Sequence, residues 1–208
     1  NEFKFSMDPL SERHHMTEKP DITALVTARM CHDLASPIGA VGNGVELVEL
    51  AGKTLGQEGE LVKASVNAAA AKLKLFRIAY GQFHSEEILH AAEISAVQTA
   101  WNITGRIQVD FALHEIPKTD MKIYLSILQS IQVAMPQGAK VVVKITEGRK
   151  IVHAVGAKVT YDETLWSALT NKDIAPNIQP NNVQFAILQA LDVPLHLNHS
   201  DTEMTVSF

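Results

Sequence analysis

The sequence predicts an α+β protein, in which a long antiparallel helical hairpin precedes a sandwich of helices on one face of a mostly antiparallel sheet. Three observations support this prediction. Apolar residues recur at helical spacing through the first third of the chain, and period-two alternation begins only at Arg106. Apolar residues make up 46% of the 208 residues and charged residues 20%, which is enough for a packed core and excludes a largely disordered chain.

The first half is expected to contain the hairpin, over residues 16–83. Residues 1–15 show no period and include a His14–His15 pair, so we treat them as vector-derived or disordered, with a zinc-binding histidine pair as the alternative. Asp21 can cap a helix that runs to about residue 50, and a glycine-rich turn separates it from a second helix over about 60–83. A hairpin cannot bury an apolar stripe on both helices by itself, so the sequence predicts a homodimer built as a four-helix bundle.

The second half, residues 84–208, is expected to form the sandwich. The expected helices are Ser85–Ile103, Thr119–Met135, Asp162–Leu169 and Asn181–Leu191. The expected strands are Arg106–Leu113, Ala139–Ile145, Lys150–Val155, Leu195–Leu197 and Glu203–Phe208, with a tight turn at residues 147–149. Trp101 and Trp166 are expected in the core or at a domain interface.

The most specific local pattern is His-Asp-Leu-Ala-Ser-Pro at residues 32–37. Apolar residues around it follow alternating spacings of four and three, at Met30, Leu34, Ile38, Val41, Val45 and Val48. His32 lies about 160° from that stripe on a helical wheel, beside Ser36, Gly39 and Asn43. Its neighbour Asp33 can bond one ring nitrogen and leave the other nucleophilic, an arrangement that suits phosphoryl transfer through phosphohistidine. The alternative is an ordinary exposed histidine on a helix whose glycines permit close packing.

Residues 29–47 resemble the phosphoacceptor segment of sensor histidine kinases and, more closely, that of the ChpT-type histidine phosphotransferases of alphaproteobacteria. The resemblance implies that His32 is the phosphoacceptor and that Asp33 orients its imidazole. It also implies that a partner docks on the surrounding surface, for which the candidates are Arg29, Ser36, Gly39 and Asn43. Lys72 is either part of a solvated face or a charge beside this site. Cys31 points away from His32 on a helix, so a Cys–His pair is disfavoured.

The second half resembles the ATP-binding domain of those kinases in degenerate form. Ser126 and Ser130 stand where a kinase carries asparagines, and the glycine loops that cradle phosphates are missing, apart from Gly156. The resemblance implies no nucleotide cofactor and no resident metal, with Mg²⁺ supplied by the partner. An ATP-dependent kinase with an atypical nucleotide site remains one alternative, and a non-catalytic dimeric interaction module is another.

The implied partners are a second copy of the chain and receiver domains, both of a hybrid histidine kinase and of response regulators. A formal net charge of -5 disfavours nucleic acid as a partner. A single cysteine excludes an intramolecular disulfide and favours a reducing compartment, so we expect a cytoplasmic protein. No apolar run approaches the ~20 residues that span a bilayer, so we expect no membrane association.

Overall fold

We describe the protein from a computed structural model. The described residues are 26, 29–30, 33–34, 36–37, 39–41, 44, 47, 56–80, 87–171 and 177–208. The expectations for residues 1–15, Cys31, Ile38, Val45 and Val48 lie outside them.

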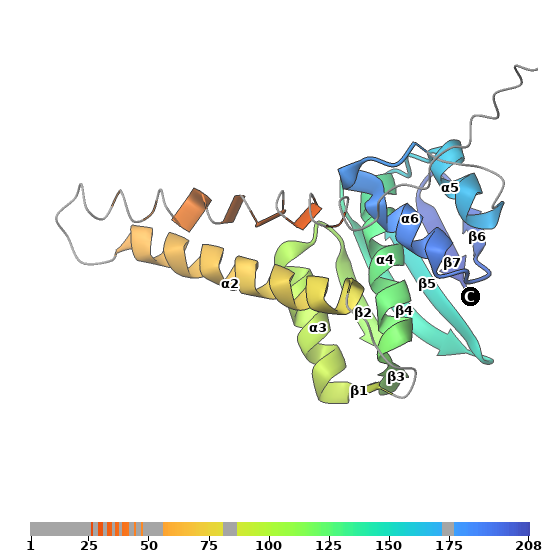
Figure 1. Cartoon of the computed structure of the whole chain (residues 1–208), viewed down its shortest axis with the longest axis horizontal. Helices are drawn as coiled ribbons and strands as arrows, with labels where there is room; N and C mark the ends of the chain where they lie inside the picture. Colours follow the sequence, from red (N-terminus) through yellow and green to blue (C-terminus); the bar gives the residue numbers. More distant parts are fainter. Residues whose placement is uncertain are drawn as a thin grey trace, which may run out of the picture.

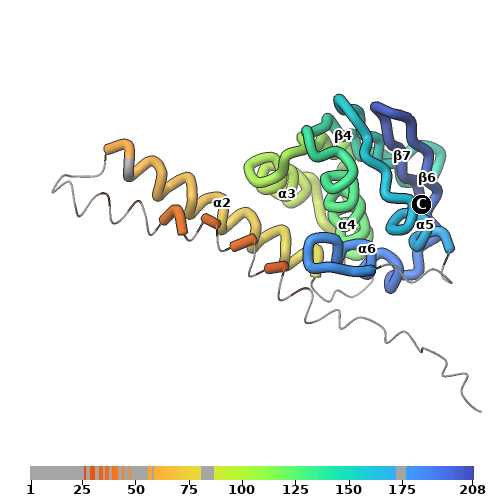
Figure 2. Tube along the Cα trace, turned by 90° about the horizontal axis from the view of Figure 1, so that it is seen from above, coloured from red at the N-terminus to blue at the C-terminus, as the bar shows by residue number. Residues whose placement is uncertain are grey.

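Two helical segments pack side by side at the N-terminal end. Every described residue between 26 and 47 is helical, and these residues run alongside α2, Gln57–Ala79, in both views (Figures 1 and 2). The predicted second helix is therefore confirmed, and it begins three residues earlier than expected. The C-terminal third of α2 buries Leu75, Phe76 and Ala79, which anchor the helical pair on the rest of the molecule.

The C-terminal half is built on a five-stranded sheet with the order β2-β4-β5-β7-β6. Its strands are β2 Gln108–Ala112, β4 Ala139–Thr146, β5 Arg149–Gly156, β6 His196–His199 and β7 Glu203–Ser207. β2 and β4 are parallel, because α4 (Lys118–Ala134) connects them as a crossover, and the other pairs are antiparallel. The mostly antiparallel sheet that the sequence predicts is confirmed.

Helices cover one face of this sheet. Residues along β4 alternate, with Val141 and Val143 buried and Lys140, Val142 and Lys144 exposed, so the core lies on a single face. The covering helices are α3 Ala91–Thr104, α4, α5 Glu163–Thr170 and α6 Val183–Ala190, with a 3-10 turn, η1, at Pro180–Asn182 (Figure 1). Trp101 and Trp166 are both buried among them, as expected.

The expected helix over 85–103 is wrong at its start. Residues Ile88–His90 form a strand, β1, that pairs with β3, Glu115–Pro117, and α3 begins only at Ala91. The backbone N–H of His90 donates to Glu93 Oε2 at 3.0 Å, which fixes the helix start there. Glu87, expected in a first helical turn, instead accepts from Lys118 Nζ at 2.9 Å.

The β4–β5 hairpin confirms the predicted turn at residues 147–149. Glu147 and Gly148 have φ values of 52° and 75°, the left-handed pair that a two-residue hairpin turn requires.

Candidate functional site

The predicted phosphoacceptor segment is described at four of its six predicted site positions. Arg29, Asp33, Ser36 and Gly39 are all helical, whereas His32 and Asn43 lie outside the described residues. The site is therefore built from the positions around His32.

The helix face predicted for His32 is open at its two described positions. Ser36 and Gly39 are exposed, and a Cβ placed on Gly39 would meet no atom within 4 Å. Pro37 and Gly44, on another face of the same segment, are buried. Positions 32, 36 and 39 share one face by helical spacing, so the small side chains on that face leave room for a large partner.

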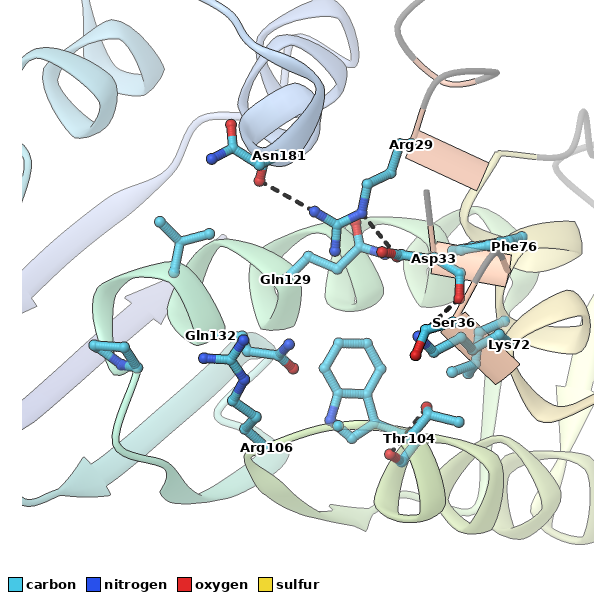
Figure 3. Close-up of a pocket in the computed structure, with 15 residues that line it drawn as sticks. Arg29, Asp33, Ser36, Lys72, Phe76, Thr104, Arg106, Gln129, Gln132 and Asn181 are labelled. Atoms are coloured by element: carbon cyan, nitrogen blue, oxygen red, sulfur yellow. Dashed lines mark hydrogen bonds and ion pairs between the residues drawn. The ribbon is translucent and has the colours of Figure 1, made fainter. Parts of the chain in front are cut away.

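Arg29 ties this segment to the C-terminal half. Its Nε donates to Asp33 Oδ2 at 2.8 Å, one helical turn away, and its Nη1 donates to the Asn181 carbonyl at 3.3 Å (Figure 3). The two side chains are only 20% and 15% exposed, so this ion pair is better shielded from solvent than an ordinary surface pair. Arg29 was predicted to meet a partner; in the structure its guanidinium is bound within the chain.

Lys72 lies against the same segment. Its Nζ donates to the backbone carbonyl of Asp33 at 3.1 Å, so the ammonium group sits next to the residue that follows position 32. Lys74 and Arg77 are exposed, as a solvated helix face requires. Of the two interpretations left open for Lys72, the structure favours a charge beside the site.

A cavity of about 480 Å³ opens where the helical segments meet α3 and α4 (Figure 3). We call it the junction cavity. Its lining includes Arg29, Asp33 and Ser36 from the first segment, Lys72, Leu75 and Phe76 from α2, Trp101, Thr104, Gly105 and Arg106 from α3 and its end, Gln129, Gln132, Val133 and Pro136 from α4 and its end, and Asn181. The cavity could not be predicted from the sequence, because its lining comes from segments as far apart as Arg29 and Asn181.

Tyr80 lies near this junction. Its hydroxyl donates to Gln129 Oε1 at 3.2 Å, and burial raises the pKa of Tyr80 above its ordinary value. The hydrogen bond and the Arg29 charge oppose that shift, and the Asp33 charge adds to it. Tyr80 therefore remains a neutral donor at neutral pH.

The two serines of α4 that match kinase asparagines bond back to carbonyls of their own helix. Ser126 and Ser130 are fully buried, and their hydroxyls donate to the carbonyls of Lys122 and Ser126 at 2.9 and 3.0 Å. Gly156 has a steric reason to be glycine, because a Cβ there would lie 2.6 Å from the Gly138 carbonyl oxygen. At all three positions the structure shows an intramolecular contact: a hydroxyl bonded to a helix carbonyl at Ser126 and Ser130, and a close backbone approach at Gly156.

The described residues contain neither a membrane-spanning helix nor a three-ligand metal site. No helix among them is long and apolar enough to cross a membrane. The part of the chain that the structure describes also holds no cluster of three His, Cys, Asp or Glu side chains able to bind a metal ion.

Comparisons with known proteins agree with one another. A family model described as histidine phosphotransferase C-terminal domain matches residues 91–197. Protein phosphotransferase ChpT from Brucella abortus (strain 2308) is 32% identical over 128 residues, so the match covers 60% of this chain and 61% of that relative's length. A solved bacterial phosphotransferase superposes with a TM-score of 0.69 at 25% identity, over 90% of this chain and 95% of that one. The Acinetobacter baumannii histidine kinase AdeS superposes with a TM-score of 0.40 at 12% identity, over 85% of this chain and 96% of that one, which is too weak to carry an argument.

Proposed function

The chain belongs to the histidine phosphotransferase family, and from that membership we propose that it passes a phosphoryl group between receiver domains through His32. The observation that carries the proposal is the open helix face at Ser36 and Gly39, which helical spacing assigns to position 32 as well. A receiver domain of a hybrid histidine kinase would be the donor, and a response regulator the acceptor.

The chemistry requires only a positioned imidazole on this chain. A lone pair on one ring nitrogen of His32 attacks the phosphorus of the donor's phospho-aspartate, and the bond from phosphorus to the aspartate oxygen breaks, leaving its electron pair on the carboxylate. In the second step an aspartate of the acceptor displaces the imidazole in the same way. Both steps balance without another reactant, and the receivers supply the Mg²⁺ that stabilises the transferred group.

Asp33 would be the positioning residue for this imidazole. Arg29 donates to its carboxylate from one helical turn earlier and is itself bonded to the Asn181 carbonyl, which holds Asp33 in a fixed orientation. A carboxylate that accepts from one ring N–H fixes the tautomer and leaves the other nitrogen basic. Lys72 would place a positive charge near the incoming phosphoryl group.

The test is transfer from a phosphorylated receiver domain of the source organism. His32→Ala should abolish labelling, because it removes the nucleophile. Asp33→Ala should slow labelling about 10–100-fold, by analogy with the loss when the hydrogen-bond partner of a metal-ligating histidine is removed. His114→Ala, at an exposed histidine on the C-terminal half, is the matched control and should transfer normally. The label should resist base and be lost in acid. Labelling of the His32→Ala protein would contradict the proposed site, and an unlabelled wild type would favour the interaction module.

Nucleotide binding separates this proposal from an ATP-dependent kinase. The engaged hydroxyls of Ser126 and Ser130 support a docking domain that no longer holds nucleotide. Calorimetry with Mg-ATP should therefore show no saturable heat below about 1 mM. Micromolar affinity for Mg-ATP, or labelling of His32 by ATP alone, would indicate an ATP-dependent kinase instead.

A second copy of the chain would complete the helical bundle. On α2, Val66 is 51% exposed and Leu73 is 44% exposed. Both lie on the same helix face as Val62, which is half-buried. Their spacing of four and seven residues forms a stripe along α2, which we call the α2 stripe. A homodimer that covers it as a four-helix bundle is the arrangement we propose.

A further inference from the structure

We propose that the junction cavity binds a small organic anion, with its charged oxygens on Arg106 and the Trp101 indole N–H and its apolar part against Phe76 and Val133. Its volume of about 480 Å³ lies within the ordinary range for small-molecule sites. The proposal concerns binding and not phosphotransfer, although Arg29, Asp33, Ser36 and Lys72 of the candidate site also line the cavity.

The charge of the cavity wall favours an anion. Arg29, Lys72 and Arg106 line it, against one carboxylate, that of Asp33, although the whole chain has a net charge of -5. Arg29 bonds Asp33, and Lys72 bonds a backbone carbonyl. Arg106 is exposed and forms no ion pair with any described residue, so its guanidinium is free to clamp an oxyanion.

A second observation is an unused buried donor in the wall. Trp101 is only 4% exposed, and its Nε1 has no hydrogen-bond partner among the described residues. The indole N–H can only donate, so an acceptor must come from a ligand or from water. A Cβ placed on Gly105 would lie 2.8 Å from this nitrogen, so any side chain at 105 would crowd the indole N–H.

The neutral polar groups of the wall include further donors. Gln129 already accepts from Tyr80 through Oε1, which leaves its amide N–H groups, and Gln132 makes no hydrogen bond to a described residue through its side chain, so its amide can also donate. Thr104 donates its hydroxyl proton to the Ala100 carbonyl, so it offers the cavity no further donor. Together with the excess of cationic side chains, the amide N–H groups match carboxylate or phosphate oxygens, and Phe76 and Val133 supply an apolar surface beside them.

The experiment titrates the full-length protein with four probes that share one ring. Phenyl phosphate and benzoate are anions, benzamide is neutral and benzylamine is a cation. The readout is the indole N–H resonance of Trp101 in ¹H–¹⁵N spectra, assigned with Trp101→Phe, since the chain has two tryptophans. Both anions should shift that resonance saturably, with phenyl phosphate stronger than benzoate, and benzamide and benzylamine should not.

Variants locate the site and test its charge. Arg106→Gln should weaken anion binding about tenfold, because it removes the unpaired guanidinium. Arg149→Gln is the matched control. Arg149 is the exposed first residue of β5 and does not line the cavity, so this variant should bind as the wild type does. Trp101→Phe keeps most of the ring volume but removes the donor, and it should weaken binding as measured by calorimetry. No saturation below about 10 mM by either anion, equal binding of benzamide, or unchanged affinity in Arg106→Gln would each overturn the proposal.

Discussion

Tyr124 in α4 has a hydroxyl that is fully buried and has no hydrogen-bond partner among the described residues. Its ring packs edge-on against Phe111 and Phe208, at centroid distances of 6.5 and 5.2 Å. Burial raises the pKa of Tyr124 far above its ordinary value of 10.0, and the Asp120 charge adds to that shift. The folded protein therefore keeps this phenol neutral at a pH where the unfolded chain has ionised it.

This shift predicts a loss of stability in alkali. A pKa that is higher in the folded state gives stability that is fully present below pH 10.0 and is lost as the pH rises from there toward the folded-state pKa. Tyr124→Phe should remove part of that loss of stability between pH 10 and about 11.5. At pH 7 the same substitution should raise the free energy of unfolding by about 1 kcal/mol, because an unpaired buried hydroxyl disappears. Urea unfolding at pH 7 and at about pH 11.5 measures the two effects.

Tyr80→Phe is the matched control for that measurement. The Tyr80 hydroxyl has a partner in Gln129, so its removal should lower the free energy of unfolding at pH 7 instead of raising it. A Tyr124→Phe protein that is less stable than wild type at pH 7 would show that the hydroxyl has a partner after all.

Among the elements, β5 ends where two backbone segments meet closely. A Cβ on Gly156 would lie 2.6 Å from the Gly138 carbonyl oxygen and 2.9 Å from Met135 Cε. Gly156→Ala should therefore lower the free energy of unfolding by about 1–3 kcal/mol, because the backbone at 138 cannot retreat without distorting β4. Chemical denaturation gives the number.

Gly39→Ala should have the opposite effect on stability to Gly156→Ala, measured by the same chemical denaturation. Nothing lies within 4 Å of a Cβ at position 39, and the residue is helical, so alanine should stabilise the protein by about 0.5–1 kcal/mol. If both substitutions changed stability equally, crowding at Gly156 would not be the cause.

The elements also show how far the sequence could predict this fold. α4 and the β4–β5 hairpin follow from clear periods and a turn signal, and they are confirmed within a residue. β1 and β3 have three residues each, too few to show alternation, and their pairing depends on contacts made after collapse.

The sequence could predict which helix face of the candidate site is exposed, but not the contacts that the site makes with distant segments. Exposure of Ser36 and Gly39 follows from helical spacing, and it is confirmed. The bond from Arg29 to the Asn181 carbonyl and the cavity around Trp101 depend on tertiary packing between distant segments. No local pattern contains that information, so the sequence could not predict the bonds that Arg29 makes within the chain, and its contact with a partner stays a prediction.

At the scale of the whole molecule, the oligomeric state tests whether the α2 stripe forms the interface of the proposed dimer. Val66→Glu should convert the proposed dimer to a monomer, because dimerisation would bury an unpaired carboxylate. The monomer should remain folded, since Val66 is half exposed within one chain. Analytical ultracentrifugation at micromolar concentration measures the mass.

Ile103→Glu is the control for that substitution. Ile103 is 56% exposed near the end of α3 and is not one of the stripe residues, so the same chemical change should leave the mass unaltered. A wild type that sediments as a monomer at micromolar concentration would rule out the proposed bundle.

The place of β7 in the sheet has a consequence for biosynthesis. β7 lies between β5 and β6, so two of the four strand pairings cannot form until residues 203–207 have left the ribosome. α2 and the segment beside it are translated about 130 residues earlier and contact each other locally, and N-terminal elements fold first during synthesis. If the proposed homodimer forms through the α2 stripe, translation would therefore present that stripe while the sheet is still open, and two neighbouring nascent chains on one messenger RNA could associate before either C-terminal half has folded.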